Sequence, residues 1–259
     1  MAQTRKHSTW VGASLAGTLT LLLAVSAFAQ VSQEFHRTVP LPANGQVSLE
    51  NVNGNVEITG WDRSEVQIDA VKKARDQQRL DEASIEVETG SDYVKIRTQY
   101  PHNQTNNNPA SVHYTLHVPQ NARLASISLI NGALTVQKVT GEVNAKLING
   151  KTQISDLIGA VNISSVNGSI EAHYASLNNV HEIKLKSVNG SIDLGLPGSP
   201  NADVKASTVN GSMKSDFPLT VQGSFASHSL SGTLGSGGTH IELSNVNGSI
   251  HIGSGGAGL

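Results

Sequence analysis

Val166-Asn167-Gly168-Ser169-Ile170 is the stretch of sequence that decides the fold, and the same five residues return at 188–192 and 246–250. Looser copies occupy 52–56, 130–134, 148–152 and 209–213, and a degenerate copy at 230–234 has Ser231 in place of the asparagine. From Asn131 onward, the copies recur every 16 to 22 residues. A regular period of this length is typical of a solenoid, in which each repeat forms one coil stacked on the next.

The flanks of each unit predict how its strands run. With the asparagine numbered zero, apolar residues recur at positions −6, −4, −1, +3 and +5. Side chains alternate along a strand, so −6 and −4 share one face while −1, +3 and +5 share the other. We therefore expect a bend or bulge between −4 and −1 that turns the −1 residues into the core. These residues are Val52, Ile130, Ile148, Val166, Val188, Val209, Leu230 and Val246.

The asparagine-glycine pairs are expected at the corners of the coils. Glycine tolerates a positive φ, and asparagine enters the left-handed region and bonds its own backbone. Asparagines stacked coil upon coil could also bond one another through their amides. A hairpin turn is the alternative meaning of Asn-Gly and would give an antiparallel sandwich, but the matched columns favour coils. The predicted corner residues are Asn53, Gly54, Asn131, Gly132, Asn149, Gly150, Asn167, Gly168, Asn189, Gly190, Asn210, Gly211, Asn247 and Gly248.

The first 29 residues have the pattern of a secretory signal peptide. Arg5 and Lys6 precede a mostly apolar run at 19–28, and Ala27-Phe28-Ala29 is a small-x-small cleavage site. The apolar run is short for a membrane span, so cleavage is favoured over retention as an anchor. After cleavage, no transmembrane segment is expected.

Residues 30–259 are predicted to form one β-solenoid domain, with regular Asn-Gly coils at 121–252 and an irregular insertion at 60–120. We expect strands at 34–39, 66–71 and 112–118, a short helix at 72–83, a hairpin of 84–88 with 93–98, and a polar loop at 101–109. The glycine-rich stretch 232–238 is expected to be a loop. The end from Gly253 onward is expected to be a frayed terminus that caps the stack poorly.

The sequence resembles the bacterial putative adhesin family of β-strand-repeat proteins, which is related to head-GIN domains. The likeness rests on Gly60-Trp61-Asp62, on the alternating segment from Val112 to Pro119, and on the serial Asn-Gly units with Gly141 and Gly159 at the coil ends. The resemblance implies an all-β, right-handed parallel β-helix of the cell envelope. That family has no established active site, so it implies no catalytic residue.

Glu171 and Asp193 form the sharpest constellation on the outward position +4. In successive stacked coils they would lie about 4.8 Å apart, one strand spacing. Two carboxylates at that distance could act as a retaining glycosidase pair or bind Ca²⁺. A plain solvated face, on which Lys214 offsets the two acids, is the favoured interpretation.

Metal and nucleic-acid binding are not expected. His113 and His117 lie on a predicted strand, where residues four apart are about 13 Å apart, too far to share one ion. His240 and Glu242 share a strand face, but the chain has no cysteine to complete a zinc site. A formal net charge of −2 gives no support for nucleic-acid binding. No cofactor is expected.

The sequence therefore predicts an exported, non-enzymatic solenoid that presents a repetitive polar surface to an envelope protein or a polysaccharide. Function is expected on the outward positions +2 and +4 or on the loops. Two alternatives stay open. One is a carbohydrate-active enzyme that uses Glu171 and Asp193, and the other is a periplasmic envelope-stress accessory protein.

Overall fold

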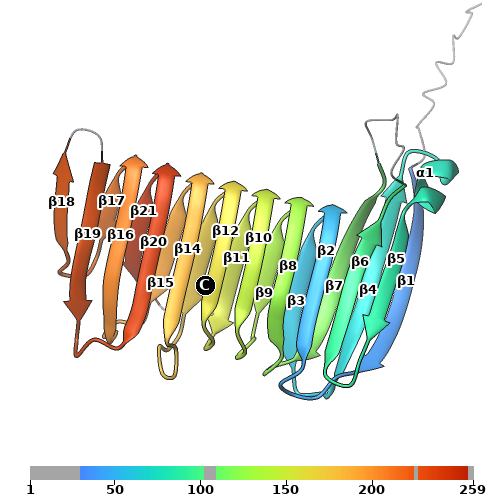
Figure 1. Ribbon diagram of the computed structural model, residues 1–259, viewed down its shortest axis with the longest axis horizontal. Coiled ribbons are helices and arrows are strands. Elements are labelled where there is room, and N and C mark those ends of the chain that lie inside the picture. The colour runs from blue at the N-terminus through green and yellow to red at the C-terminus, as the bar shows by residue number, and fades with distance from the viewer. Residues whose placement is uncertain (1–29, 102–108, 225–226, 256–259) are drawn as a thin grey trace, which may run out of the picture.

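Two long, mostly parallel β-sheets face each other and make up almost all of the molecule (Figure 1). The computed structural model describes residues 30–101, 109–224 and 227–255. The predicted signal peptide and most of the predicted loop at 101–109 lie outside these residues. Sheet A has 10 strands and sheet B has 11.

The N-terminal third supplies one end of each sheet. In sheet A, β4 pairs antiparallel with both β1 and β7, and β7 then pairs parallel with β3. In sheet B, the predicted hairpin is present as β5 and β6, and β6 pairs parallel with β2. The elements are β1 (Val31–Pro40), β2 (Gln46–Asn53), β3 (Val56–Trp61), β4 (Glu65–Ala74), α1 (Gln77–Glu82), β5 (Ser84–Thr89), β6 (Tyr93–Gln99) and β7 (Ser111–Pro119).

The predicted helix at 72–83 is shorter than expected. Strand β4 continues to Ala74 because it pairs along its whole length with β1. Asp76 then caps α1, accepting a bond from the Arg79 amide at 2.9 Å. The buried side chain of Leu80 packs the helix against the N-terminal end of the stack.

From β8 onward, each regular coil contributes one strand to sheet B, an Asn-Gly corner, and one strand to sheet A. Parallel pairing keeps equivalent residues in register, as in Asn149 beside Asn167 and Gln153 beside Glu171. The strands are β8 (Arg123–Asn131), β9 (Leu134–Gln137), β10 (Val143–Asn149), β11 (Thr152–Leu157), β12 (Val161–Asn167), β13 (Ile170–Tyr174), β14 (Glu182–Asn189), β15 (Ile192–Leu196), β16 (Ala202–Asn210), β17 (Met213–Ser215), β20 (Thr239–Asn247) and β21 (Ile250–Ser254).

The coils do not stack in the order of the chain. Strand β20 lies between β14 and β16 in sheet B, and β21 lies between β15 and β17 in sheet A (Figure 1). The expectation of a frayed, poorly capping terminus from Gly253 onward is wrong for Gly253 and Ser254, which belong to the interior strand β21. Residues 256–259 of that stretch lie outside the described residues.

The degenerate unit at 230–234 forms no corner. Its residues belong to β19 (Ser227–Leu234), which runs straight and antiparallel to both β16 and β18 (Thr220–Ser224). The hairpin of β18 and β19 ends sheet B beyond the last coil. Ser231 has no amide to join a stack of asparagines, which removes one reason to turn there. Leu230 is buried, but within this hairpin rather than at a coil corner.

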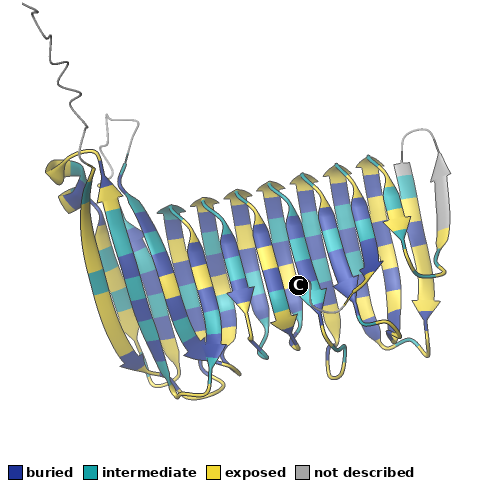
Figure 2. Ribbon diagram, turned by 180° about the vertical axis from the view of Figure 1, so that it is seen from behind, coloured by how far each residue is buried: buried dark blue, intermediate teal, exposed yellow. Residues whose placement is uncertain are grey.

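Alternation along most coils places the core where positions −6, −4, +3 and +5 predict it (Figure 2), although Met213 and Ser215 of β17 are only half-buried. In the coil of β12 and β13, for example, Val161, Ile163, Ile170 and Ala172 are all buried. The coil of β8 is an exception, since a register shift next to β10 puts Leu124 inside in place of the predicted Ala125.

The predicted inward position of the −1 residues is wrong. Alternation continues past −4, so position −2 is buried and −1 faces outward, as Ser165 and Val166 show. The change of direction comes at the Asn-Gly pair itself, because −1 and the asparagine are both exposed. The bend therefore lies after position −1, at the Asn-Gly pair, and not before it as the column pattern indicated.

Candidate functional site

A continuous ladder of asparagine side chains runs along the corners. From Asn131 onward, each Nδ2 donates to the Oδ1 of the asparagine that precedes it in the stack, at 2.8 to 3.0 Å. The backbone is tied in the same way, since the Gly168 amide donates to the Asn189 carbonyl at 2.9 Å. In stacking order the ladder is Asn53, Asn131, Asn149, Asn167, Asn189, Asn247 and Asn210.

The glycine after each asparagine is required by close approach between coils. A Cβ on Gly168 would overlap the carbonyl oxygen of Gly150 in the neighbouring coil. Positive φ is a second reason at some corners only, such as Gly190 with a φ of 152°. Gly159, at the opposite end of its coil, approaches the Gly141 carbonyl equally closely. Corner residues are thus accounted for by the packing of the stack.

A row of exposed aliphatic side chains runs beside the asparagine ladder on the outer face of sheet B. Their exposed fractions range from 38 to 47%. They belong to the strands β8, β10, β12, β14, β20 and β16, which are neighbours in that order. We call this set the aliphatic row: Ile130, Ile148, Val166, Val188, Val246 and Val209.

Position −3, on the same face, is polar and borders the aliphatic row. Serines and lysines alternate there from strand to strand, and the paired neighbours are Ser128, Lys146, Ser164, Lys186 and Ser244. Between the two rows lies a groove of about 520 Å³. Its lining includes five members of the aliphatic row, from Ile130 to Val246. The groove thus has one aliphatic side and one side of hydroxyls and ammonium groups.

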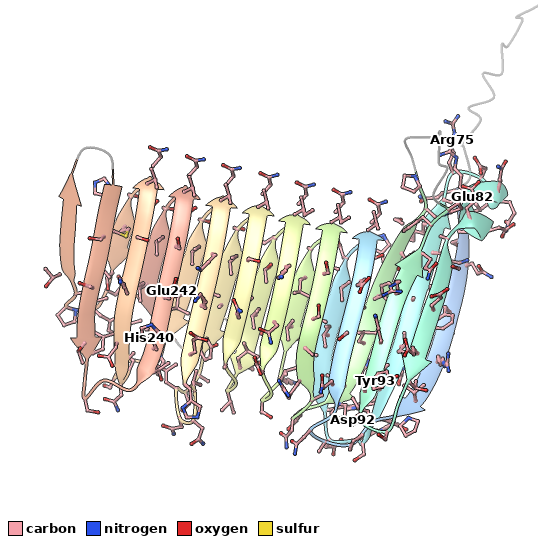
Figure 3. The ribbon with its side chains drawn as sticks, in the orientation of Figure 1. Arg75, Glu82, Asp92, Tyr93, His240 and Glu242 are labelled. Carbon is pink, nitrogen blue, oxygen red and sulfur yellow. The ribbon has the colours of Figure 1, made fainter. Side chains whose placement is uncertain are left out.

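The two lysines of the groove differ in their surroundings. Glu242 lies on the outer face of the adjacent β20 (Figure 3). Lys186 reaches Glu242 at 3.2 Å, but Glu242 also pairs with Lys184 at 2.8 Å. These lysines lower the pKa of Glu242, with the bond from Lys184 as the largest cause. Lys146 has no carboxylate within ion-pairing distance among the described residues. The groove therefore carries positive charge that the protein's own acids do not fully balance.

The structure brings Glu171 and Asp193 side by side, as directly paired residues of β13 and β15. Glu171 is engaged by Lys151 at 2.7 Å and by His173 at 3.2 Å. The bond from Lys151 is the main reason that the pKa of Glu171 is lowered. A glycosidase acid needs a raised pKa, so this environment suits a structural ion pair rather than proton donation.

Asp193 has a different neighbour from the one expected. The predicted neighbour Lys214 lies two strands away, because the inserted β21 places His251 directly beside Asp193. His251 Nδ1 lies 3.2 Å from Asp193, and its Nε2 lies 3.7 Å from Asp216. The imidazole thus bridges carboxylates from the coils on both sides of the inserted one.

The histidines considered as metal ligands are not assembled into a site. His113 and His117 lie four residues apart on β7, and His240 and Glu242 share the outer face of β20. Within the described ranges, no group of three or more histidine, aspartate or glutamate side chains could hold a metal ion. Nor does that part of the chain contain a helix long and apolar enough to span a membrane.

Sequence reasoning therefore missed the aliphatic row as a surface. It singled out the −1 residues but assigned them to the core, and it sought function at +2 and +4. The inward position −2 was hidden in the sequence, because only Leu129 and Leu147 are apolar there and the later coils have Ser165, Ser187 and Thr208. Two of these polar residues are accommodated by bonds to corner carbonyls: the Ser187 hydroxyl donates to Gly168 and the Thr208 hydroxyl to Gly248, each at 3.2 Å.

Comparison with known proteins places this architecture. The structure of a putative cell adhesion protein from Clostridium sporogenes has a TM-score of 0.53 at 14% identity, covering 87% of this chain and all of that one. A putative adhesin from Bacteroides fragilis has a TM-score of 0.39 at 14% identity, covering 86% of this chain and 97% of that one. A putative lipid binding protein from Parabacteroides distasonis has a TM-score of 0.36 at 13% identity, covering 86% of this chain and 95% of that one. The first likeness shows a shared fold, and the two lower scores carry no argument. No curated protein matches the chain. The Toastrack DUF4097 family model matches residues 3–253, so the chain belongs to the Toastrack family.

Proposed function

We propose that this protein is an exported, non-enzymatic binding protein of the cell envelope that holds its partner on the aliphatic row. The observation that carries the proposal is the row itself. Six β-branched side chains on adjacent strands are each exposed by 38 to 47%. Exposed apolar side chains that gather in one place mark interaction sites more often than scattered ones do.

The fold alone does not account for this row. β-Branched residues favour strands, and stacked aliphatic neighbours add some stability. Positions −3 and −5 lie on the same strands and the same face, yet they are filled by polar residues such as Ser164 and Asn162. Only the −1 position combines exposure with an aliphatic side chain in six adjacent strands. This selectivity favours a contact surface.

The rigidity of the coils suits such a role. Parallel ladders and the asparagine ladder fix the spacing between members of the row. A surface that is already ordered loses little conformational entropy when it binds. The solenoid would therefore act as a ruler that presents apolar contacts at intervals of one strand spacing, about 4.8 Å.

The enzyme alternative is less well supported. Glu171 and Asp193 are neighbours, but each has its own cationic or imidazole partner. Replacing both by Gln and Asn gives a direct test with a polysaccharide substrate. Cleavage by the wild type that is lost in this double variant would establish the enzyme and remove the non-enzymatic proposal.

Two observations support a location in the cell envelope: the predicted signal peptide, and the shared fold with the Clostridium sporogenes protein named as a putative cell adhesion protein. Surface adhesion and a periplasmic accessory role share the same binding face and differ in compartment. Protease treatment of intact cells distinguishes them, since only a surface protein is digested without breaking the envelope.

Site-specific photo-crosslinking in intact cells tests the binding face. A photoreactive amino acid at Ile148 or Val166 should capture a partner, whereas the same group at Ile158 should not. Ile158 is a matched control because it is 42% exposed but lies outside the row. Equal capture at all three positions, or capture only at Ile158, would refute the proposed face.

A further inference from the structure

We propose that the aliphatic row and the lysines beside it bind a single long-chain carboxylate, an amphiphile of the fatty-acid class. This inference rests on the proposed function and names the ligand of the same face. The chain of the ligand would lie along the aliphatic row, and its carboxylate would meet Lys146 or Lys186.

The length and width of the groove suit one extended hydrocarbon chain. Five members of the row line the groove from β8 to β20, and four strand spacings between them amount to about 19 Å. The aliphatic side is one residue wide, with the asparagine ladder on one flank and position −3 on the other. A groove of about 520 Å³ lies within the range of small-molecule sites. A strip this narrow offers little area to a membrane surface.

The lysines supply the charge that a carboxylate head requires. Lys146 and Lys186 flank Ser164 on adjacent strands, so they stand about 9.6 Å apart. Lys146 has no acidic partner among the described residues, and Lys186 shares Glu242 with Lys184. An ammonium group beside an apolar groove favours an anionic head on an apolar ligand, through a charge-assisted hydrogen bond.

Polar polymers fit the groove less well. Backbone N–H and C=O groups of β10, β12 and β14 are used in pairing with neighbouring strands, so they cannot bond a glycan or peptide lying across the face. Besides the two lysines, the serine hydroxyls are the polar side chains of the lining. A glycan or an extended peptide would thus press hydrogen-bonding groups against the aliphatic row, which carries a desolvation cost.

A second copy of the chain is disfavoured by charge. The lysines are placed symmetrically about Val166, the middle of the lined row. In a two-fold dimer centred there, Lys146 of one copy would face Lys186 of the other. Like charges opposed in this way weaken association. An anionic ligand removes the same conflict.

Displacement of cis-parinaric acid by sodium palmitate, measured on the full chain, tests the proposal. The double variant I148S/V166S should bind palmitate at least about tenfold more weakly, because two aliphatic contacts are lost. The matched control I158S should bind as the wild type does. Both changes affect exposed side chains, and circular dichroism checks that the strands are retained. Equal palmitate affinity in the wild type and I148S/V166S would overturn the site.

The head group is tested separately with K146Q/K186Q. This variant should lose about tenfold in affinity for palmitate and keep its affinity for hexadecanol, which has no charge. The control K214Q changes an exposed lysine on sheet A and should change neither affinity. A parallel loss for both ligands would remove the lysines from the proposal.

The outcomes separate this inference from the broader function. Binding to phosphatidylglycerol vesicles without binding of palmitate would replace the proposed ligand by a membrane surface. Row-specific crosslinks to a protein, again without palmitate binding, would refute the amphiphile and leave the binding face intact. Absence of both palmitate binding and row-specific crosslinks would refute both.

Discussion

Asn247 is stacked directly on Asn189, 58 residues earlier in the chain, and donates its amide to the Asn189 oxygen at 2.8 Å. Asn210, which comes between them in sequence, is stacked on the far side of Asn247 at 3.0 Å. The coil formed by β20 and β21 is therefore an interior coil. Its strands have coil neighbours on both sides in both sheets.

Engineered disulfides should report this order directly, since the chain has no cysteine of its own. Lys184 and Glu242 are paired neighbours on β14 and β20, so K184C/E242C should oxidise readily to a disulfide. Lys184 and Lys205 are separated by β20 and lie about 9.6 Å apart, beyond the reach of a disulfide. K184C/K205C should therefore stay reduced, as measured by thiol titration and peptide mapping.

The reverse result, a disulfide in K184C/K205C but not in K184C/E242C, would mean that the coils stack in chain order. Lys205 and Glu242 are themselves paired neighbours, so K205C/E242C serves as a second positive control.

The asparagine ladder should contribute measurably to stability. Asn167→Ala removes one bond to Asn149 and one to Asn189, each at 2.9 Å. Hydrogen bonds contribute about 0.5–1.5 kcal/mol each, and these are exposed, so we expect a loss of about 1 kcal/mol in the free energy of unfolding. Denaturant titration measures it. The control Asn162→Ala lies on the exposed face of β12 outside the ladder and should cost less. If both variants lost the same free energy of unfolding, the asparagine ladder would have no stabilising role.

Corner glycines should be far less replaceable than loop glycines. Gly168→Ala forces a methyl group against the Gly150 carbonyl, whereas a Cβ at Gly198 meets no atom within 4 Å. We expect Gly168→Ala to cost about 3 kcal/mol, from overpacking between coils, and Gly198→Ala to be close to neutral. Thermal unfolding of the two variants compares them. If Gly168→Ala left the thermal stability unchanged, the coils could move apart at this corner without loss of stability.

Alkaline pH should unfold the protein through its tyrosines. Burial raises the pKa of Tyr114 to about 12, and burial likewise raises the pKa of Tyr100 and of Tyr174. The pKa of the exposed Tyr93 is raised by its hydrogen bond to Glu88. Because the folded protein holds these tyrosines neutral, they contribute to the free energy of unfolding as long as they are neutral. This contribution is complete below the tyrosine pKa of the unfolded chain, about 10, and is lost as pH rises through about 12.

Tyrosinate absorbance and circular dichroism, followed together against pH, check this. The two signals should change together, above the ordinary tyrosine range. Tyrosines that ionise near pH 10 while the strands remain intact would contradict it.

Much of the fold could be predicted because the repeat acts locally. Alternation around each Asn-Gly pair fixes which residues of a strand face inward, and Val161, Ile163, Ile170 and Ala172 follow it. Parallel pairing could be predicted because the same position in every unit holds a similar residue, and stacked coils place those positions side by side. The insertion of the coil of β20 and β21 between two earlier coils could not be predicted. Asn189, Asn210 and Asn247 have nearly identical flanks, so no local feature distinguishes one stacking order from another.

The face of the candidate site could not be predicted, because a one-residue difference in where the corner begins reverses a side chain. A valine can face either the core or the solvent, so the presence of Val166 in the sequence does not tell which way its side chain points. Its neighbour Ser165 is buried, which leaves Val166 outside, but a serine in the sequence gives no apolar signal of that burial.

The interior position of β20 and β21 has a consequence for synthesis, in which a chain emerges from its N-terminal side. Strand β16 becomes available before β20 does, and at that moment the edge of β14 is unoccupied. Ala206 and Val204 of β16 carry the same inward columns as Leu243 and Ile241 of β20. The order of emergence and the order of assembly are therefore opposed. Either β16 to β19 wait as an unattached segment, or they bind β14 first and must be displaced, so the native stack is reached only after a later segment takes an earlier place.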